Sequence, residues 1–332
     1  MASGKRTVQI ALVANSIIGV VKFIAYASSG SAAMLSEGIH SVADVLNQGL
    51  LLLGIKRSEA SANERFKYGY GAERYFWALI SAVGIFFLGC GVTVYHGIHA
   101  IIDGHPAGAG AWDYGVLILG LILEGGALAM AVKGINADRG DTPFMKFLST
   151  SDDPTAIAVL LEDSVACLGL LVAFAGILLS NALDSSVPDG VASIIIGLLL
   201  GLVAVFLIAK NHSLIIGKSV NQSIEQAAKD ILAKRSSVER ILDFKSRVLS
   251  AEHFRLKVEV EFDGAVLADR LLEKRELAEL HAEATASPEA LRALMRTFAN
   301  DVVDELGDEV DRIEAELREA LPGVQHIDIE AD

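Results

Sequence analysis

Side chains that can bind a metal ion occur inside an apolar stretch near the start of the sequence. In LSEGIHSVADVLNQ, residues 35–48, His40 and Asp44 are four residues apart, and Asn47 follows three residues later. In a helix these three side chains lie on nearly the same face, within two turns. An imidazole nitrogen, a carboxylate oxygen and an amide oxygen suit Zn²⁺, and they are tolerable ligands for Mn²⁺, Fe²⁺ or Co²⁺.

A second acidic site lies much later in the chain, where Glu162 and Asp163 are adjacent in VLLEDSVACLG, residues 159–169. Adjacent helical residues point about 100° apart, so these carboxylates cannot both face one metal equally. We favour Asp163 as the ligand, and we expect Glu162 to be a further ligand, a proton carrier or a group that positions a ligand. His40, Asp44 and Asp163 then form a site between two facing helices.

Both motifs fall in segments that can cross a bilayer, for which about 20 apolar residues are needed. The sequence predicts six such segments, at residues 8–28, 32–54, 77–102, 114–132, 155–179 and 191–209. An ionisable side chain inside a membrane span is costly and therefore indicates function. The alternative is that these groups only join helices by hydrogen bonds, which are worth about 1 kcal/mol each in a membrane and are a poor reason for a histidine and several carboxylates.

Other polar residues also lie inside the predicted spans, among them Lys22 and Glu124. Lys22 either neutralises one of the buried carboxylates or extends its ammonium group toward water. For Glu124 we expect a structural role, or a role in positioning a ligand, before a role as a ligand.

Charge divides the sequence into two domains. Hydrophobic residues make up 52% of the chain and the net charge is -14, with a mean hydropathy of +0.45. Residues 219–332 hold 15 Lys and Arg against 26 Asp and Glu, whereas residues 1–218 hold 13 against 16. We therefore predict a transmembrane domain at 1–218 and an acidic, water-soluble domain at 219–332. This acidic balance gives no reason to expect a nucleic-acid partner.

Basic residues mark one side of the membrane. Lys or Arg occurs before the first span and in the loops after the second, fourth and sixth spans, with Lys146 in the loop after the fourth. The opposite loops, at 28–31, 103–113 and 180–190, contain neither. The positive-inside rule then places both termini in the cytoplasm. The prediction is a multi-pass protein of the lipid bilayer, in a bacterial inner membrane.

The acidic domain has a mixed pattern. A helix is predicted at 223–234, strands within 238–250 and 253–262, a charged helix at 267–284, a long amphipathic helix from Ser287 and Pro288 to Ala320, and a last strand from residue 324. This order predicts a small α/β domain in which a helical insertion, at about 264–300, follows the second strand.

Together these features resemble the cation diffusion facilitator family of metal/proton antiporters, over nearly the whole chain. The run FKYGYGAERYFWAL, residues 66–79, resembles the Gly-rich start of the third span in that family, although Lys67 stands where proline is common. Pro188, Asp189 and Gly190 resemble the start of its sixth span. The resemblance implies an all-α domain of six transmembrane helices, a ferredoxin-like (α+β) cytoplasmic domain and a homodimer.

One departure from the family pattern concerns the metal site. Many zinc-transporting members have a histidine four residues before the fifth-span aspartate, where this chain has Val159. The sequences HSVADVLNQ, residues 40–48, and LLEDSVA, residues 160–166, resemble instead the branch of the family that contains the ninth mammalian zinc transporter. The fourth ligand then comes from Asn47, Glu162 or water.

The resemblance implies a secondary transporter, not an enzyme, which exports Zn²⁺ from the cytoplasm in exchange for protons by alternating access. Two alternatives remain open within the same fold: export of Mn²⁺, Fe²⁺ or Co²⁺, and a regulatory or scaffold protein that transports nothing. A membrane metalloenzyme is a poorer match, since no HExxH or comparable arrangement of nucleophile and base is present.

Overall fold

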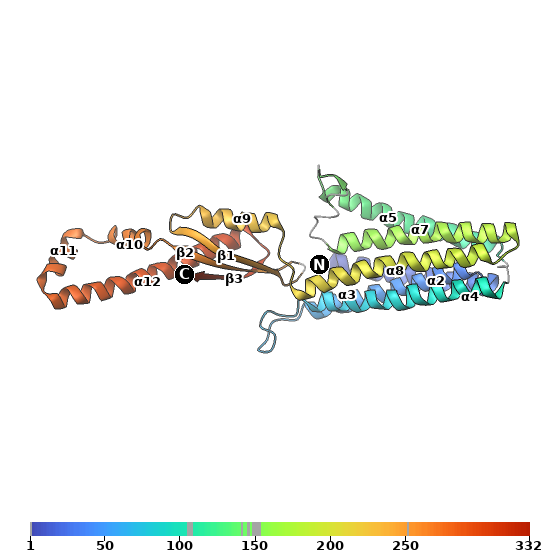
Figure 1. Cartoon of the computed structure of the whole chain (residues 1–332), viewed down its shortest axis with the longest axis horizontal. Helices are drawn as coiled ribbons and strands as arrows, with labels where there is room; N and C mark the ends of the chain where they lie inside the picture. Colours follow the sequence, from blue (N-terminus) through green and yellow to red (C-terminus); the bar gives the residue numbers. More distant parts are fainter. Residues whose placement is uncertain (1, 105–108, 141, 145–146, 148–153, 251) are drawn as a thin grey trace. The chain divides into compact units, whose positions relative to one another are not determined.

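The computed structural model describes residues 2–104, 109–140, 142–144, 147, 154–250 and 252–332, without the side chains of residues 2–11, 14, 138 and 154–158. Lys146 lies outside the described residues. The chain divides into two compact units, residues 1–216 and 217–332 (Figure 1). Each unit has its own hydrophobic core.

The first unit is a bundle of long helices (Figure 1). Its elements are α1 (Ala2–Ser29), α2 (Ala32–Ser58), α3 (Glu73–Gly84), η1 (Ile85–Val92), α4 (Thr93–Asp103), α5 (Ala111–Asp138), α7 (Pro154–Leu183) and α8 (Val187–Ile216). The segment η1 is π-helical and joins α3 to α4 without a break. These three elements together form the predicted third span.

Among the described residues, five stretches are long and apolar enough to cross a membrane: 32–58, 73–103, 111–137, 159–183 and 187–216. They contain the second, third, fourth and sixth predicted spans and most of the fifth, and the 28-residue α1 lies at the first. Large apolar side chains such as Phe87, Ile122 and Leu202 are exposed on the outside of the bundle. A surface of this kind is unfavourable in water and suits lipid. The predicted helical membrane domain is therefore confirmed.

Small residues allow the helices to approach closely. A Cβ atom added to Gly97 on α4 would lie 2.7 Å from the backbone oxygen of Gly190 and 2.8 Å from Cγ1 of Ile194, both on α8. In lipid such close backbone approach is a main source of helix association, because apolar side chains gain little by leaving the acyl chains.

The second unit is a small α/β domain, as predicted. It comprises α9 (Gln222–Ala233), β1 (Val238–Val248), β2 (Phe254–Phe262), α10 (Gly264–Leu272), α11 (Leu277–Ala286), α12 (Pro288–Ala320) and β3 (Val324–Ala331). The sheet order is β1-β2-β3, with β2 antiparallel to β1 and parallel to β3. Alternate residues of β2, Leu256, Val258 and Val260, are fully buried against Ile313 and Leu317 of α12.

The predicted helix at 267–284 is wrong in one respect, because the structure has two helices there, α10 and α11, separated by residues 273–276. Two basic residues of this turn pair with α12: Nζ of Lys274 lies 2.9 Å from Oε2 of Glu305, and Nη2 of Arg275 lies 3.4 Å from Oδ2 of Asp301. These ion pairs stabilise the turn between α10 and α11. They depend on contacts with α12, which local helix propensity does not predict.

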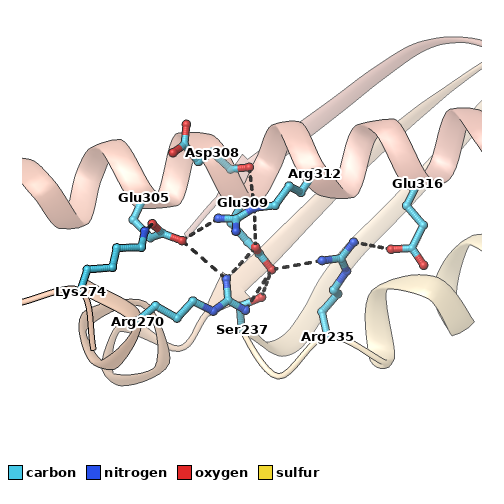
Figure 2. Close-up of polar contacts among 9 residues, drawn as sticks. All are labelled: Arg235, Ser237, Arg270, Lys274, Glu305, Asp308, Glu309, Arg312 and Glu316. Atoms are coloured by element: carbon cyan, nitrogen blue, oxygen red, sulfur yellow. Dashed lines mark hydrogen bonds and ion pairs between the residues drawn. The ribbon is translucent and has the colours of Figure 1, made fainter. Parts of the chain in front are cut away.

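A buried ionic network joins α12 to the elements beside it (Figure 2). Glu305 and Glu309 are one turn apart on α12, and only 4% and 0% of their surfaces are exposed. Arg270 of α10 donates to Glu309 at 2.7 Å, and Arg312 donates to Glu305 at 2.6 Å. Hydrogen bonds from Arg312 and then Lys274 lower the pKa of Glu305 to about 2. The network therefore stays ionised at neutral pH.

Candidate metal centre

The N-terminus of α2 is held by a buried carboxylate from α8. Asp189 is 3% exposed and accepts hydrogen bonds from Oγ of Ser31 at 2.7 Å and from the backbone N–H of Ala32 at 2.6 Å. Oγ of Ser31 in turn accepts from the backbone N–H of Met34. A carboxylate at this end satisfies free N–H groups and complements the helix dipole. The residues of the HSVAD motif are thus positioned from outside their own helix.

His40 and Asp44 lie on the same face of α2, as their spacing predicts. His40 is 4% exposed, and its Nε2 lies 3.5 Å from Oδ2 of Asp44. Neither ring nitrogen of His40 has a hydrogen-bond partner among the described residues. An unsatisfied buried polar group is costly, and a metal ion or a proton shared with a neighbour would satisfy this one.

A cavity of about 40 Å³ lies between the helices next to this pair. Its lining includes Asp44 and Asn47 of α2 and both Glu162 and Asp163 of α7. The remaining lining residues come from α1, α2, α5 and α7: Asn15, Gln48, Glu124 and Ala166. Four carboxylates therefore line the cavity. His40 is not among the lining residues, but it lies next to one of them, Asp44.

Asn47 joins the two halves of the site. Its side-chain nitrogen donates to Oε1 and Oε2 of Glu162 at 3.2 and 3.1 Å, and its carbonyl oxygen accepts from Oγ of Ser81 at 2.8 Å. The amide nitrogen has no lone pair for a metal, and the oxygen already has a donor. In this arrangement the amide nitrogen of Asn47 orients Glu162, and its carbonyl oxygen keeps one lone pair beside the contact with Ser81.

Both Glu162 and Asp163 line the cavity, so the expectation that Asp163 is the ligand stays a prediction. The described residues contain no group of three or more His, Cys, Asp or Glu side chains close enough to hold one ion. His40, Asp44 and Asp163 are thus neighbours in one region and do not form a closed coordination shell. Val159, which occupies the position of the missing histidine, is 41% exposed.

Lys22 neutralises a carboxylate, which was one of the two alternatives left open by the sequence. Its Nζ lies 2.9 Å from Oε2 of Glu37, and both side chains are fully buried. Glu37 precedes His40 by one helical turn, and a Cβ atom added to Gly169 of α7 would lie 2.7 Å from its Oε1. The sequence left open whether Lys22 has an acidic partner, and the choice of Glu37 among several carboxylates depends on the packing.

Glu124 and Asn15 are the lining residues whose role the sequence left least defined. Glu124 is 9% exposed and brings a fourth carboxylate to the cavity from α5. The sequence marks each of them only as a polar residue inside an apolar span, which does not show that its side chain lines the cavity.

The fold and the cavity define a multi-pass membrane protein with a buried acidic site. Residues 8–216 match the family model described as the cation efflux transmembrane domain, and the chain belongs to this family.

Curated relatives extend the match along the chain. A mouse protein named proton-coupled zinc antiporter SLC30A9, mitochondrial, is 36% identical over 329 residues, which cover 98% of this chain and 58% of the relative. The human protein of the same name matches to the same extent. Metal tolerance protein C4 of Arabidopsis thaliana is 34% identical over 337 residues, which cover 98% of this chain and 73% of that protein. This chain thus spans little more than half of the mouse and human relatives.

Proposed function

We propose that this protein is a secondary active transporter that exports Zn²⁺ in exchange for protons. The observation that carries the proposal is the cavity between α2 and α7, where Asp44, Glu162 and Asp163 meet beside His40. Carboxylates inside a membrane bundle are favourable only when a cation or protons neutralise them. The names of the mouse and human relatives, which specify zinc and proton coupling, agree with that requirement.

In the proposed cycle, zinc and protons compete for the same atoms. In the state open to the side with the basic loops, the incoming cation binds at His40, Asp44 and Asp163 and replaces protons that these groups would otherwise hold. Rearrangement of the helices opens the site to the other side, where protons displace the metal. Glu162 is a proton carrier or a fourth ligand, and Asn47 controls its position.

The proposal also concerns topology and assembly. The basic loops and the acidic unit lie on the same side of the membrane, and the working form is a homodimer. Because relatives named as mitochondrial match this chain at 36% identity, the proposal does not restrict the host membrane to a bacterial inner membrane.

The test is uptake of radioactive zinc by proteoliposomes with an imposed pH gradient. Wild type should take up zinc only when the gradient is present, and Asp44→Ala or Asp163→Ala should lower uptake on the order of 100-fold through loss of a ligand. Val42→Ala is the matched control, because Val42 lies on the same helix and is 42% exposed on its outer surface. Equal uptake by wild type and both aspartate variants would refute the proposal.

A second candidate is a regulatory protein on the same fold that binds metal without moving it. The sequence feature behind it is Val159, which stands where many zinc-transporting members of the family have a histidine. Zinc binding by reconstituted wild type without gradient-dependent uptake would select this candidate. Parallel measurements with Mn²⁺, Fe²⁺ and Co²⁺ separate both candidates from a transporter of another metal.

A further inference from the structure

Gln48, the last residue of the LSEGIHSVADVLNQ motif, has a buried side-chain oxygen that lacks a partner. Within the part of the chain that the structure describes, Oε1 of Gln48 accepts no hydrogen bond. Gln48 also lines the cavity beside Asp44. A buried carbonyl oxygen is unfavourable until a donor or a cation reaches it. Ionised carboxylates in the cavity have no proton to donate, whereas a divalent metal ion takes an amide oxygen as a ligand.

Gln48 continues the row that His40 and Asp44 begin on α2. The three residues follow one another at intervals of four, so each is turned by about 40° from the one before and lies about 6 Å farther along the helix. Asn47 lies beside this row, but its side-chain oxygen already accepts from Ser81 at 2.8 Å. Of these two amide oxygens, that of Gln48 is therefore the one with both lone pairs open to a metal.

The helices α2 and α7 pass the cavity in opposite directions, as two contacts show. A Cβ atom added to Gly169 would lie 2.7 Å from Oε1 of Glu37, and Asn47 donates to Glu162 at 3.2 Å. From the first contact to the second, residue numbers rise on α2 and fall on α7. The C-terminal part of α2 and the N-terminal part of α7 therefore lie at the same end of the cavity.

Gln48 and Val159 both lie toward that end. Gln48 follows Asp44 by four residues, and Val159 precedes Asp163 by four, so each lies about one helical turn beyond its aspartate. At about 100° per residue, Val159 falls between Glu162 and Asp163 around the axis of α7. A ligand side chain at position 159 would therefore approach the cavity at the end where Gln48 approaches it from α2.

We propose that Gln48, through Oε1, supplies the fourth ligand of the metal ion that binds in this cavity, in place of the histidine that α7 lacks. His40, Asp44 and Asp163 supply the other three ligands, which leaves Glu162 to carry a proton. The described side chains form no closed shell, so the metal draws these donors together as it binds. The inference rests on the proposed function only for the statement that the bound ion is then transported.

The proposed ligand set also defines a class of substrate. It consists of one imidazole nitrogen and three oxygens, whereas a site with a histidine at position 159 would have two nitrogens. Carboxylate and carbonyl oxygens suit Mn²⁺, and imidazole nitrogen favours Zn²⁺. We therefore expect this site to discriminate only weakly between Zn²⁺ and Mn²⁺.

Calorimetry of metal binding to the full-length protein in detergent tests the proposal without requiring transport. Gln48→Leu keeps the approximate size of the side chain and removes its oxygen, so zinc affinity should fall on the order of tenfold. Gln48→Glu retains an oxygen at this position and should bind zinc at least as tightly as wild type. Leu46→Ala is the matched control and should leave zinc affinity unchanged, because Leu46 lies on the same helix and is 47% exposed.

Val159→His tests whether Gln48 takes the place of the missing histidine. In the Gln48→Leu protein this substitution should restore zinc affinity to within about threefold of wild type. In the wild-type protein it should change the affinity far less, because four ligands are already present. The double variant should also prefer zinc over manganese on the order of tenfold more strongly than wild type. The absorption spectrum of bound Co²⁺ should shift in the double variant, since a nitrogen ligand replaces an oxygen.

Three results would overturn the proposal. The first is a zinc affinity of Gln48→Leu equal to that of wild type. The second is an equal gain from Val159→His in the wild-type and Gln48→Leu proteins. The third is binding by Gln48→Glu as weak as that by Gln48→Leu, which would make the amide a hydrogen-bond donor to a carboxylate. If wild type binds zinc through Gln48 and yet carries none in the uptake assay, the proposed function fails and the assignment of Gln48 as a ligand stands.

Discussion

Asn47 of α2 forms hydrogen bonds with side chains from two other helices. It donates to both carboxylate oxygens of Glu162 and accepts from Ser81, so that α2, α3 and α7 meet at one amide. A group that orients a metal ligand usually contributes to affinity nearly as much as a ligand does. The roles of Asn47 and Glu162 can therefore be separated only by changing each of them alone.

We expect Asn47→Ala and Glu162→Gln to differ in their effects. Asn47→Ala removes the donor that orients Glu162, so zinc affinity should fall roughly tenfold, by analogy with other groups that orient ligands. Glu162→Gln keeps the shape of the side chain and removes its ability to bind and release a proton. If Glu162 carries the proton, zinc affinity should change less than about threefold while gradient-driven uptake is lost. Calorimetry with zinc and a proteoliposome uptake assay measure the two effects, and Val42→Ala is again the control. A large loss of affinity in Glu162→Gln would make this residue a ligand.

The pair formed by Lys22 and Glu37 should behave as a unit. Removing one partner leaves an unpaired charge among α1, α2 and α7, so Lys22→Met or Glu37→Gln alone should lower stability by about 3–5 kcal/mol. The double variant should recover most of this loss, because no charge remains buried. The midpoint of thermal unfolding in detergent measures all three variants. If the losses of the single variants add in the double variant, the two residues do not stabilise the bundle as a pair.

At the scale of elements, the contact between α4 and α8 depends on the absence of side chains. Gly97 and Gly190 approach so closely that a Cβ atom on either would lie 2.7 Å from a backbone oxygen of the other. Such a contact between backbone atoms cannot adjust by a change of rotamer. The sixth span therefore keeps its position against the third only while these residues remain glycine.

Gly97→Ala should lower the stability of the membrane unit by about 2 kcal/mol, because the helices must separate. Gly115→Ala is the matched control: residue 115 also lies in a membrane helix, and its added Cβ would meet nothing within 4 Å. Alanine has the higher helix propensity, so this control should be neutral or slightly stabilising. Thermal unfolding in detergent compares the two variants. Equal effects would show that the contact between α4 and α8 tolerates a methyl group.

At the scale of the whole molecule, two separate cores imply that a substitution in one unit changes the stability of that unit alone. The candidate metal centre belongs entirely to residues 1–216, whereas the ionic network of Figure 2 belongs to residues 217–332. Changes in groups that share no contacts usually have additive effects. A change in the network should therefore alter the stability of the second unit without altering the membrane site.

Glu305→Gln provides the test, and its effect should depend on pH. Hydrogen bonds lower the pKa of Glu305 from 4.5 to about 2, so this carboxylate stabilises the folded unit above pH 4.5 and loses that effect as the pH falls toward 2. At neutral pH the variant should be less stable by about 1 kcal/mol. The difference from wild type should narrow between pH 4.5 and 2, measured by thermal unfolding of residues 217–332 with circular dichroism. Zinc affinity of the full chain should not change, and a change would show that the units are coupled.

The sequence by itself determined the features that depend on local composition and period. Apolar length defines the spans, the four-residue spacing places His40 and Asp44 on one face of α2, and alternation in β2 identifies the core of the sheet. These properties follow from the geometry of a single helix or strand and from the cost of exposing apolar surface to water or polar groups to lipid.

Only the tertiary structure decided how these elements meet. It paired Lys22 with Glu37, placed Asp189 at the start of α2, and turned the amide nitrogen of Asn47 toward Glu162. The chain separation in the last two contacts exceeds 100 residues. The rotation and crossing of packed helices depend on where small residues permit close approach. The sequence pattern of one helix does not show where the small residues of its partner helix lie.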